Sequence, residues 1–332
     1  MAGDIWVVAE LAEGGLARIS TEAATAGREL AAAAGREVVG VVVAAAPDEP
    51  ARELARYVPR VVAIEDPAAG EHAWSAVAAT DLAALLEREG PSCVLVGATP
   101  DGRDLAGILA ARLGWGVLAN ATGLSWSPDG PTVEMSVFGG KLLTSSAFTV
   151  EHGIVTVRPG TVTAVTTGTS GTIEPVAGGA GGRATGPGTD VPLVRVVERV
   201  SEAGAAAPIE EAKVIVAGGR GVGGPEGFRI VEELAAELGG VVGATRAAVD
   251  AGWIPYARQI GQTGKTVKPT LYVALGISGA IQHKVGMQSA GTIVAVNRDP
   301  DAPLAEFADL YVVGDLFEVV PAVLAELRAR RT

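Results

Sequence analysis

Short apolar runs alternate with segments of helical pattern along the first third of the chain. A run that is apolar at nearly every position predicts a strand covered on both faces, as in a parallel sheet. The helical segments end at Gly or Gly-Pro, which commonly terminate helices, and Ser20 is the expected N-cap of the first one. The expected strands are 5–10, 38–46, 60–64 and 92–97, and the expected helices are 20–34, 49–57, 71–89 and 102–113. This alternation predicts a doubly wound parallel sheet flanked by helices.

The pattern changes over residues 122–168, where helix formers are sparse. Turns at Gly130-Pro131 and Gly139-Gly140 separate β-type runs, which cover 132–138, 142–150 and 154–157. Runs joined by short Gly-containing turns are typical of antiparallel strands. We therefore expect antiparallel strands added to the N-terminal sheet.

A second alternation of strands and helices occupies the C-terminal part. The expected strands are 193–200, 212–217, 241–244, 271–275, 292–296 and 310–313, and the expected helices are 228–238, a short piece after residue 280, and 317–330. The most Gly-rich stretch, 177–190, is interpreted as a linker rather than a phosphate-binding loop, because no strand runs into it and no helix follows. We expect two α/β domains, 1–190 and 191–332, each with a mainly parallel sheet.

Composition narrows the kinds of chemistry that are available. The net charge of −12 argues against non-specific binding of nucleic acid, which needs clustered Lys and Arg. The single cysteine, Cys93, lies in an apolar run and excludes an internal disulfide, and the three histidines lack metal-ligand spacing. Redox chemistry would therefore need an organic cofactor. Without a visible leader, or an apolar run of about 18 residues free of breakers, we expect a cytoplasmic protein that is not embedded in a membrane.

Gly219, Gly221 and Gly224 form a G-x-G-x-x-G pattern between a predicted strand and a predicted helix. This context favours binding of a pyrophosphate at the turn. A nicotinamide-binding unit also needs an acid at the end of the next strand, but here that strand ends in Thr245-Arg246. Arg246 could face a phosphate or an electron-rich ring, or it could form an ion pair with Asp250 one turn later.

Further candidates follow the later strands. Thr263, in a Gly-Gln-Thr-Gly loop, could bond a flavin ring atom, although a simple turn is the alternative. His283 could be structural, or its imidazolium could stabilise the negative charge of a reduced flavin ring around N1 and O2. Asn297 and Asp315 end successive strands, which suits recognition of an adenosine, but also suits turn or cap residues.

Together, these segments resemble the α subunit of electron-transfer flavoprotein, a family that includes the FixB proteins. The C-terminal resemblance is carried by GGRG at 218–221, GATRAAVDAGW at 243–253, IGQTGKTVKPTLYVALGISGAIQHKVGM at 260–287 and IVAVNRDPDAPLAEFADLYVVGDL at 293–316. The N-terminal resemblance is looser, through IWVVAE at 5–10, GRDLAGILAARLG at 102–114 and TVRPG at 156–160.

The resemblance implies that FAD binds to a Rossmann-like C-terminal domain, with its ring at the interface with a β subunit that the N-terminal domain also contacts. Arg246 would pack over the ring, with Thr263 near N5 and His283 near N1 and O2. The pyrophosphate and ribityl chain would lie along Arg220, Thr245, Ser278, Gly279, Ala280, Ile281 and Gln282, and the adenosine at Asn297, Asp315 and Leu316. Gly221, Ile260, Gly261 and Gln262 complete the expected contacts.

The function implied by the resemblance is electron carriage without substrate turnover. FAD would accept electrons from flavin dehydrogenases, such as acyl-CoA dehydrogenases, and pass them to a quinone oxidoreductase. Two alternatives stay open: the α subunit of a bifurcating electron-transfer flavoprotein, whose β subunit carries another flavin, and an NAD(P)-linked oxidoreductase that uses the same glycine pattern.

Overall fold

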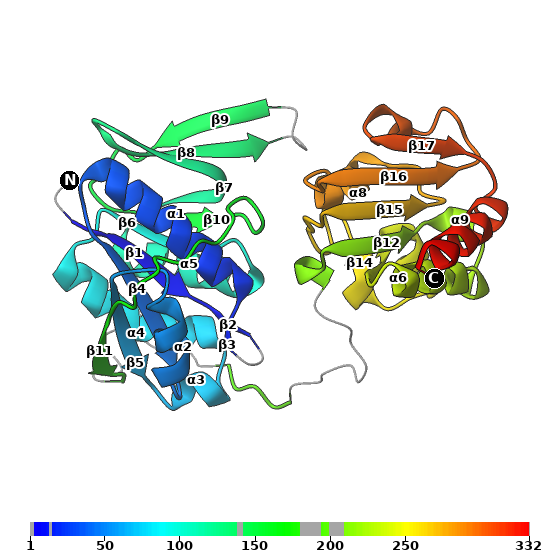
Figure 1. The fold of residues 1–332 in the computed structure, drawn as a ribbon. Helices are drawn as coiled ribbons and strands as arrows, with labels where there is room; N and C mark the ends of the chain where they lie inside the picture. Colours follow the sequence, from blue (N-terminus) through cyan, green and yellow to red (C-terminus); the bar gives the residue numbers. More distant parts are fainter. Residues whose placement is uncertain (1–2, 13–14, 138–141, 180–193, 199–208, 332) are drawn as a thin grey trace. The chain divides into compact units, whose positions relative to one another are not determined.

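The computed structural model shows two α/β units (Figure 1). The residues that the structure describes are 3–12, 15–137, 142–179, 194–198 and 209–331. Contacts divide the chain into Met1–Val200 and Ser201–Thr332. The expected boundary after residue 190 and most of the Gly-rich stretch lie outside the described residues, so the domain limits 1–190 and 191–332 stay predictions.

A nine-stranded sheet forms the centre of the N-terminal unit, in the order β11-β5-β4-β1-β6-β10-β7-β8-β9. The strands are β1 (Ile5–Ala9), β4 (Val38–Ala44), β5 (Arg60–Glu65), β6 (Cys93–Gly97), β7 (Gly116–Ser127), β8 (Gly130–Val137), β9 (Leu142–Ala147), β10 (Gly153–Val157) and β11 (Thr172–Ala177), beside a separate pair, β2 (Leu11–Ala12) and β3 (Gly15–Leu16). Every residue of β1, β4 and β6 is buried, and these strands pair in parallel. The predicted parallel sheet is therefore confirmed.

Helices cover both faces of this sheet. They are α1 (Arg18–Ala34), α2 (Asp48–Leu54), α3 (Ala68–Glu71), α4 (Trp74–Glu89) and α5 (Pro100–Leu113). Alternate residues of β1 enter different hydrophobic clusters, so that Val7 packs with α1 and α2, whereas Val8 packs with α4 and α5. Cys93 is fully buried, and burial raises the pKa of its thiol to about 12, which confirms it as a small apolar core residue.

Three strands of this sheet differ from the sequence-based expectation. The segment 154–157 was expected to be antiparallel, but β10 pairs in parallel with β6 and β7, and the expectation is wrong. Complete burial of β10 fits its place inside the sheet. The added antiparallel strands are confirmed for β8 and β9, and β8 also pairs in antiparallel fashion with β7. No strand is predicted over β7 or β11, because exposed residues interrupt any apolar run there.

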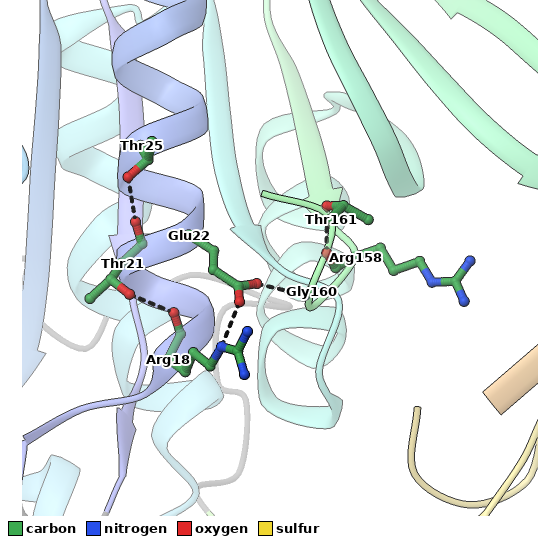
Figure 2. A network of polar contacts seen from close by, with 7 residues as sticks. All are labelled: Arg18, Thr21, Glu22, Thr25, Arg158, Gly160 and Thr161. Atoms are coloured by element: carbon green, nitrogen blue, oxygen red, sulfur yellow. Dashed lines mark hydrogen bonds and ion pairs between the residues drawn. The ribbon is translucent and has the colours of Figure 1, made fainter. Parts of the chain in front are cut away.

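The first helix begins at Arg18, so Ser20 lies inside the helix and is not its N-cap. The Ser20 hydroxyl accepts from the Glu10 amide and donates to the Glu10 carbonyl, both at 2.8 Å. These two bonds attach α1 to the end of β1. Figure 2 shows a second attachment, in which the buried Glu22 carboxylate accepts from Arg18 Nε at 2.8 Å and from the Gly160 amide at 2.7 Å. These bonds hold the TVRPG segment against α1.

Asp81 of α4 holds the residues that follow β11. Its Oδ1 accepts from the Gly179 amide at 2.8 Å. Burial and, to a smaller extent, the neighbouring Asp66 raise its pKa to about 6, although the bond from Gly179 lowers it. The folded chain therefore favours the protonated acid, and this contribution to stability is lost as the pH rises through 6. We expect Asp81→Asn to raise the free energy of unfolding at pH 7.5, by about 1 kcal/mol at most because water screens a partly buried group. Urea denaturation checks this, and an equal gain near pH 4 would contradict it.

A six-stranded parallel sheet forms the C-terminal unit, in the order β14-β13-β12-β15-β16-β17. Its strands are β12 (Val214–Gly218), β13 (Val241–Thr245), β14 (Gln259–Ile260), β15 (Leu271–Leu275), β16 (Thr292–Asn297) and β17 (Leu310–Val313), and its helices are α6 (Phe228–Glu237), α7 (Arg246–Asp250), α8 (Ile281–Met287) and α9 (Leu316–Arg331). Helices α6 and α9 pack with one hydrophobic cluster and α8 with the other. The expected class, two α/β units with mainly parallel sheets, is confirmed.

Two further observations concern the segment 194–198 and the possibility of a membrane-spanning helix. The expected strand 193–200 lies partly outside the described residues, and within 194–198 only Arg195 forms an isolated bridge, to His72. Among the helices of the described part of the chain, none combines the length and the apolar character that crossing a membrane requires.

Candidate functional site

The centre of the six-stranded sheet is a topological switch point. From β12 the chain continues to β13 on one side and later to β15 on the other, so the loops that leave β12 and β15 diverge. Open parallel sheets bind ligands in the crevice at this point, outside the carboxyl ends of the strands. The residues expected to bind a cofactor all lie at or just after a carboxyl end: Arg220 and Gly221 (β12), Thr245 and Arg246 (β13), Ile260 to Thr263 (β14), Ser278 to His283 (β15), Asn297 (β16), and Asp315 and Leu316 (β17).

Glycines allow the two diverging loops to touch at the switch point. The Gly221 amide donates to the Gly276 carbonyl at 2.9 Å, and a Cβ on Gly221 would lie 2.6 Å from the Gly276 Cα. A Cβ on Gly219 would lie 2.4 Å from the Gly276 carbonyl oxygen. Gly224 has open space around the Cβ position, so the third glycine of the pattern is not needed for packing. Gly227 is needed for packing, because a Cβ on this residue would lie 1.8 Å from the Val222 carbonyl oxygen.

The Thr245 hydroxyl is a polar group at this edge that has no partner among the described residues. Its Oγ1 is buried and forms no hydrogen bond to any of the described residues. Buried hydroxyls are normally hydrogen-bonded, so an unsatisfied one calls for a ligand or a water molecule. The glycines packed at the switch point and this hydroxyl fit a cofactor with a phosphate and polyol chain, as FAD has.

Arg246 begins α7 at the same edge. Its Nε forms an ion pair with Asp250 Oδ2 at 3.1 Å, and both side chains are largely exposed. The ion pair that was the alternative for this residue is therefore present. An exposed pair of this kind contributes little to stability, which leaves the guanidinium available as a charge beside a ligand.

The 261–265 loop and the start of α8 are joined by backbone contacts. The Gln262 amide donates to the Gln282 carbonyl at 2.7 Å. A Cβ on Gly261 would lie 2.8 Å from the same carbonyl oxygen. The side chains of Gln262, Thr263 and Gln282 are exposed. The structure thus brings together two segments that the sequence separates by some twenty residues, and places their polar side chains on the outside.

His283 differs from its expected charge state. Its side chain is buried, with Nδ1 3.0 Å from the Ile260 carbonyl oxygen and Nε2 2.9 Å from the Tyr272 hydroxyl. A carbonyl oxygen can only accept, so Nδ1 carries the proton and Nε2 accepts from Tyr272. Burial lowers the pKa of His283 to about 4, so the expected imidazolium is wrong at neutral pH. Burial is the physical reason, and it outweighs the bond to the Ile260 carbonyl, which raises the pKa.

Asn297 and Asp315 both have structural partners. Asn297 Nδ2 donates to the Ile277 carbonyl at 3.0 Å. Asp315 Oδ1 accepts from the Phe317 amide at 2.9 Å at the start of α9, a bond that, with the nearby Arg298, lowers the pKa of the carboxyl. The turn and cap roles are therefore observed, and the contact with adenosine stays a prediction.

A glycine-lined switch point and an unsatisfied buried hydroxyl define an α/β protein with a nucleotide-type cofactor site. Residues 208–288 match the family model of the electron transfer flavoprotein FAD-binding domain, and residues 5–180 match that of the electron transfer flavoprotein domain. Electron transfer flavoprotein subunit alpha of Mycobacterium tuberculosis (strain ATCC 25618 / H37Rv) is 43% identical over 337 residues, which cover 99% of each chain.

Two other relatives agree. The subunit alpha of Thermoanaerobacterium thermosaccharolyticum is 39% identical over 98% of each chain. Protein FixB of Clostridium saccharobutylicum is 37% identical over 98% of this chain and 96% of the relative. The chain belongs to the electron transfer flavoprotein alpha-subunit family, and its C-terminal unit contains the FAD-binding domain.

Sequence reasoning missed Gln259, Tyr272 and Gly276. Gln259 and Tyr272 are buried polar side chains that bond to Thr263 and His283. Their signal in the sequence is weak, because a Gln that follows Arg258, or a Tyr at one position of an apolar run, is as readily explained by an exposed position. Gly276 ends a predicted strand, where a sharp turn already explains it.

Proposed function

We propose that the chain is the α subunit of a heterodimeric electron-transfer flavoprotein, and that FAD binds along the carboxyl edge of its six-stranded sheet. The observation that carries this proposal is the buried, unsatisfied Thr245 hydroxyl beside the glycine-lined switch point. The match to an FAD-binding domain over 208–288 supports it. The name "subunit alpha" of the relatives supports a β subunit as partner.

Each residue of the edge has a separate task in this proposal. Arg220, beside the Gly221 turn, holds the pyrophosphate, and Thr245 and the 278–282 segment hold the ribityl chain. Arg246 places a positive charge at the ring, Thr263 offers a hydroxyl to it, and His283 faces it as a neutral side chain. Asn297, Asp315 and Leu316 border the adenosine. FAD supplies the one- and two-electron redox chemistry, and these residues bind it and adjust its potential.

The partners of the electron transfer are part of the proposal. Flavin dehydrogenases, such as acyl-CoA dehydrogenases, donate electrons and a quinone oxidoreductase accepts them, while the chain turns over no substrate of its own. The ring lies at the interface with the β subunit, and the complex works in the cytoplasm. The missing acid after β13 speaks against an NAD(P)-linked oxidoreductase.

Co-purification with a β subunit of the same family tests the proposal. We expect a yellow heterodimer that releases one FAD on extraction. A second flavin in the β subunit would favour the bifurcating type instead. A colourless heterodimer that takes up no FAD would overturn the proposal.

Charge at the site gives a prediction for the reduction potential. Removing the Arg246 guanidinium should lower the potential, since a positive charge favours the more negative, reduced cofactor. We expect a shift of tens of millivolts for Arg246→Ala, since about 1.4 kcal/mol corresponds to about 59 mV for one electron. Asp250→Asn is the matched variant with the opposite sign, because it removes the partner carboxylate. Redox titration of the heterodimers decides, and equal potentials in all three proteins would refute the role of Arg246.

A further inference from the structure

Gln259 is a buried polar residue that the proposed site does not yet use. It lies in β14 beside the predicted flavin-binding loop and is only 2% exposed. Burial of an amide is unfavourable unless its hydrogen bonds are made inside the protein. The bonds of Gln259 therefore indicate why a glutamine stands at this position.

The 261–265 loop turns around Gln259. The Gln259 carbonyl accepts from the Lys265 amide at 2.7 Å, and a Cβ on Gly264 would lie 2.4 Å from that carbonyl oxygen. Gln259 Nε2 lies 3.1 Å from Thr263 Oγ1. The Tyr256 hydroxyl donates to the Thr263 carbonyl at 2.6 Å. The backbone of Thr263 is thus held by Tyr256, and its hydroxyl by Gln259.

The donors and acceptors of this bond determine its direction. An amide nitrogen only donates, so Thr263 Oγ1 is the acceptor, and the hydroxyl proton is left to donate elsewhere. Thr263 is exposed at the carboxyl edge, so an acceptor outside the chain can reach this proton. A partner for it is an atom with a lone pair, such as a flavin ring nitrogen.

We infer that Gln259 is a positioning residue, whose buried amide makes the Thr263 hydroxyl a hydrogen-bond donor to the ring of FAD. The inference rests on the proposed function. Loss of the amide frees the hydroxyl to rotate and to donate inward, so the ring loses its donor although Thr263 is unchanged. Loss of Gln259 and loss of the Thr263 hydroxyl should then have the same effect on the ring.

A double-mutant cycle on the α–β heterodimer tests this, with reduction potential and FAD content as measurements. We expect Gln259→Leu and Thr263→Val to shift the redox equilibrium against a reference dye by the same sign and by about three- to tenfold, the effect of one hydrogen bond. The double variant should shift no further than Thr263→Val alone. Gln288→Leu, the same substitution after α8, should leave the equilibrium unchanged, and Thr263→Ser should retain the wild-type value.

Two results would overturn the inference. One is a wild-type potential in Gln259→Leu while the potential of Thr263→Val is shifted. The other is a double variant whose shift equals the sum of the two single shifts, since a merely structural glutamine acts independently of the hydroxyl. If Gln259→Leu does not fold, Gln259→Glu replaces it in the same cycle. A carboxylate accepts a hydrogen bond where the amide donates one, so it reverses the bond to Thr263. The cycle removes the effect of the added charge on the reduction potential. A wild-type heterodimer without flavin would overturn the proposed function as well, and that result appears before any variant is compared.

Discussion

Gly221→Ala is expected to release FAD from the chain and to lower the free energy of unfolding. The new methyl group would lie 2.6 Å from the Gly276 Cα and 2.8 Å from its carbonyl oxygen. These are backbone atoms of the other loop at the switch point, and they cannot move aside as the end of a side chain could. Forcing a methyl group into such a contact costs about 1–3 kcal/mol. Opening the crevice should also weaken FAD binding more than about tenfold, since each 1.4 kcal/mol changes the dissociation constant tenfold.

Gly224→Ala is the matched control in the same turn. Gly224 has φ 162° and ψ 179°, an extended conformation that any residue adopts, and no atom lies within 4 Å of its Cβ position. We expect wild-type stability and wild-type FAD content for this variant. Urea denaturation measures the stability, and the flavin-to-protein absorbance ratio measures the FAD content. Equal FAD retention in the two variants would show that the Gly221–Gly276 contact does not shape the site.

This contrast also marks what a sequence pattern can predict. All three glycines of G-x-G-x-x-G look equivalent along the chain, but only the first two meet the backbone of the loop after β15. That loop lies more than fifty residues further on, so the contact depends on tertiary structure. The third close-packing position is Gly227, which the pattern does not include.

Most of the fold was predictable, because both central sheets are covered on two faces. Strands such as β1, β4 and β6 are apolar at every position and appear as uninterrupted runs. β11 does not appear as such a run, since it is an exposed edge strand that contains Pro175. The position of β10 was not predictable either, because strand order is a long-range property and the preceding hairpin suggested an antiparallel partner.

The place of the site was predictable, but the state of its side chains was not. Carboxyl ends of parallel strands share one edge, so Thr245 and Asn297 were expected together from the strand pattern. Thr263 was expected there only from the resemblance, because no strand was predicted before it. Hydrogen-bond partners and burial decide what each side chain can do there. The expected charge on His283 was wrong because burial of the imidazole lowers its pKa by more than the bond to the Ile260 carbonyl raises it, and this burial is not visible in the sequence.

The neutral, buried His283 leads to a second large effect, a loss of stability in weak acid. The pKa of this imidazole is about 4 in the folded chain, against an ordinary value of 6.5. Above pH 6.5 both states are neutral, and the contribution of the buried ring is fully present. As the pH falls from 6.5 towards 4, the unfolded chain binds a proton that the folded chain does not, so the free energy of unfolding falls. Between pH 7.5 and pH 5 the loss should be about 2 kcal/mol, at 1.36 kcal/mol for each pKa unit.

His283→Gln should remove this part of the acid loss, since an amide can donate to the Ile260 carbonyl and accept from Tyr272 without titrating. Urea denaturation of the full chain at pH 7.5 and pH 5, with the same FAD concentration in every sample, gives the difference for each variant. Tyr272→Phe should cost about 1–3 kcal/mol at pH 7.5, because it leaves Nε2 buried without a donor. Tyr311→Phe removes the same hydroxyl from a more exposed tyrosine. It should change neither the free energy of unfolding at pH 7.5 nor its loss between pH 7.5 and pH 5 by much. If wild type and His283→Gln lose the same stability between the two pH values, the imidazole is not held neutral by burial, and the charge expected from the sequence would regain support.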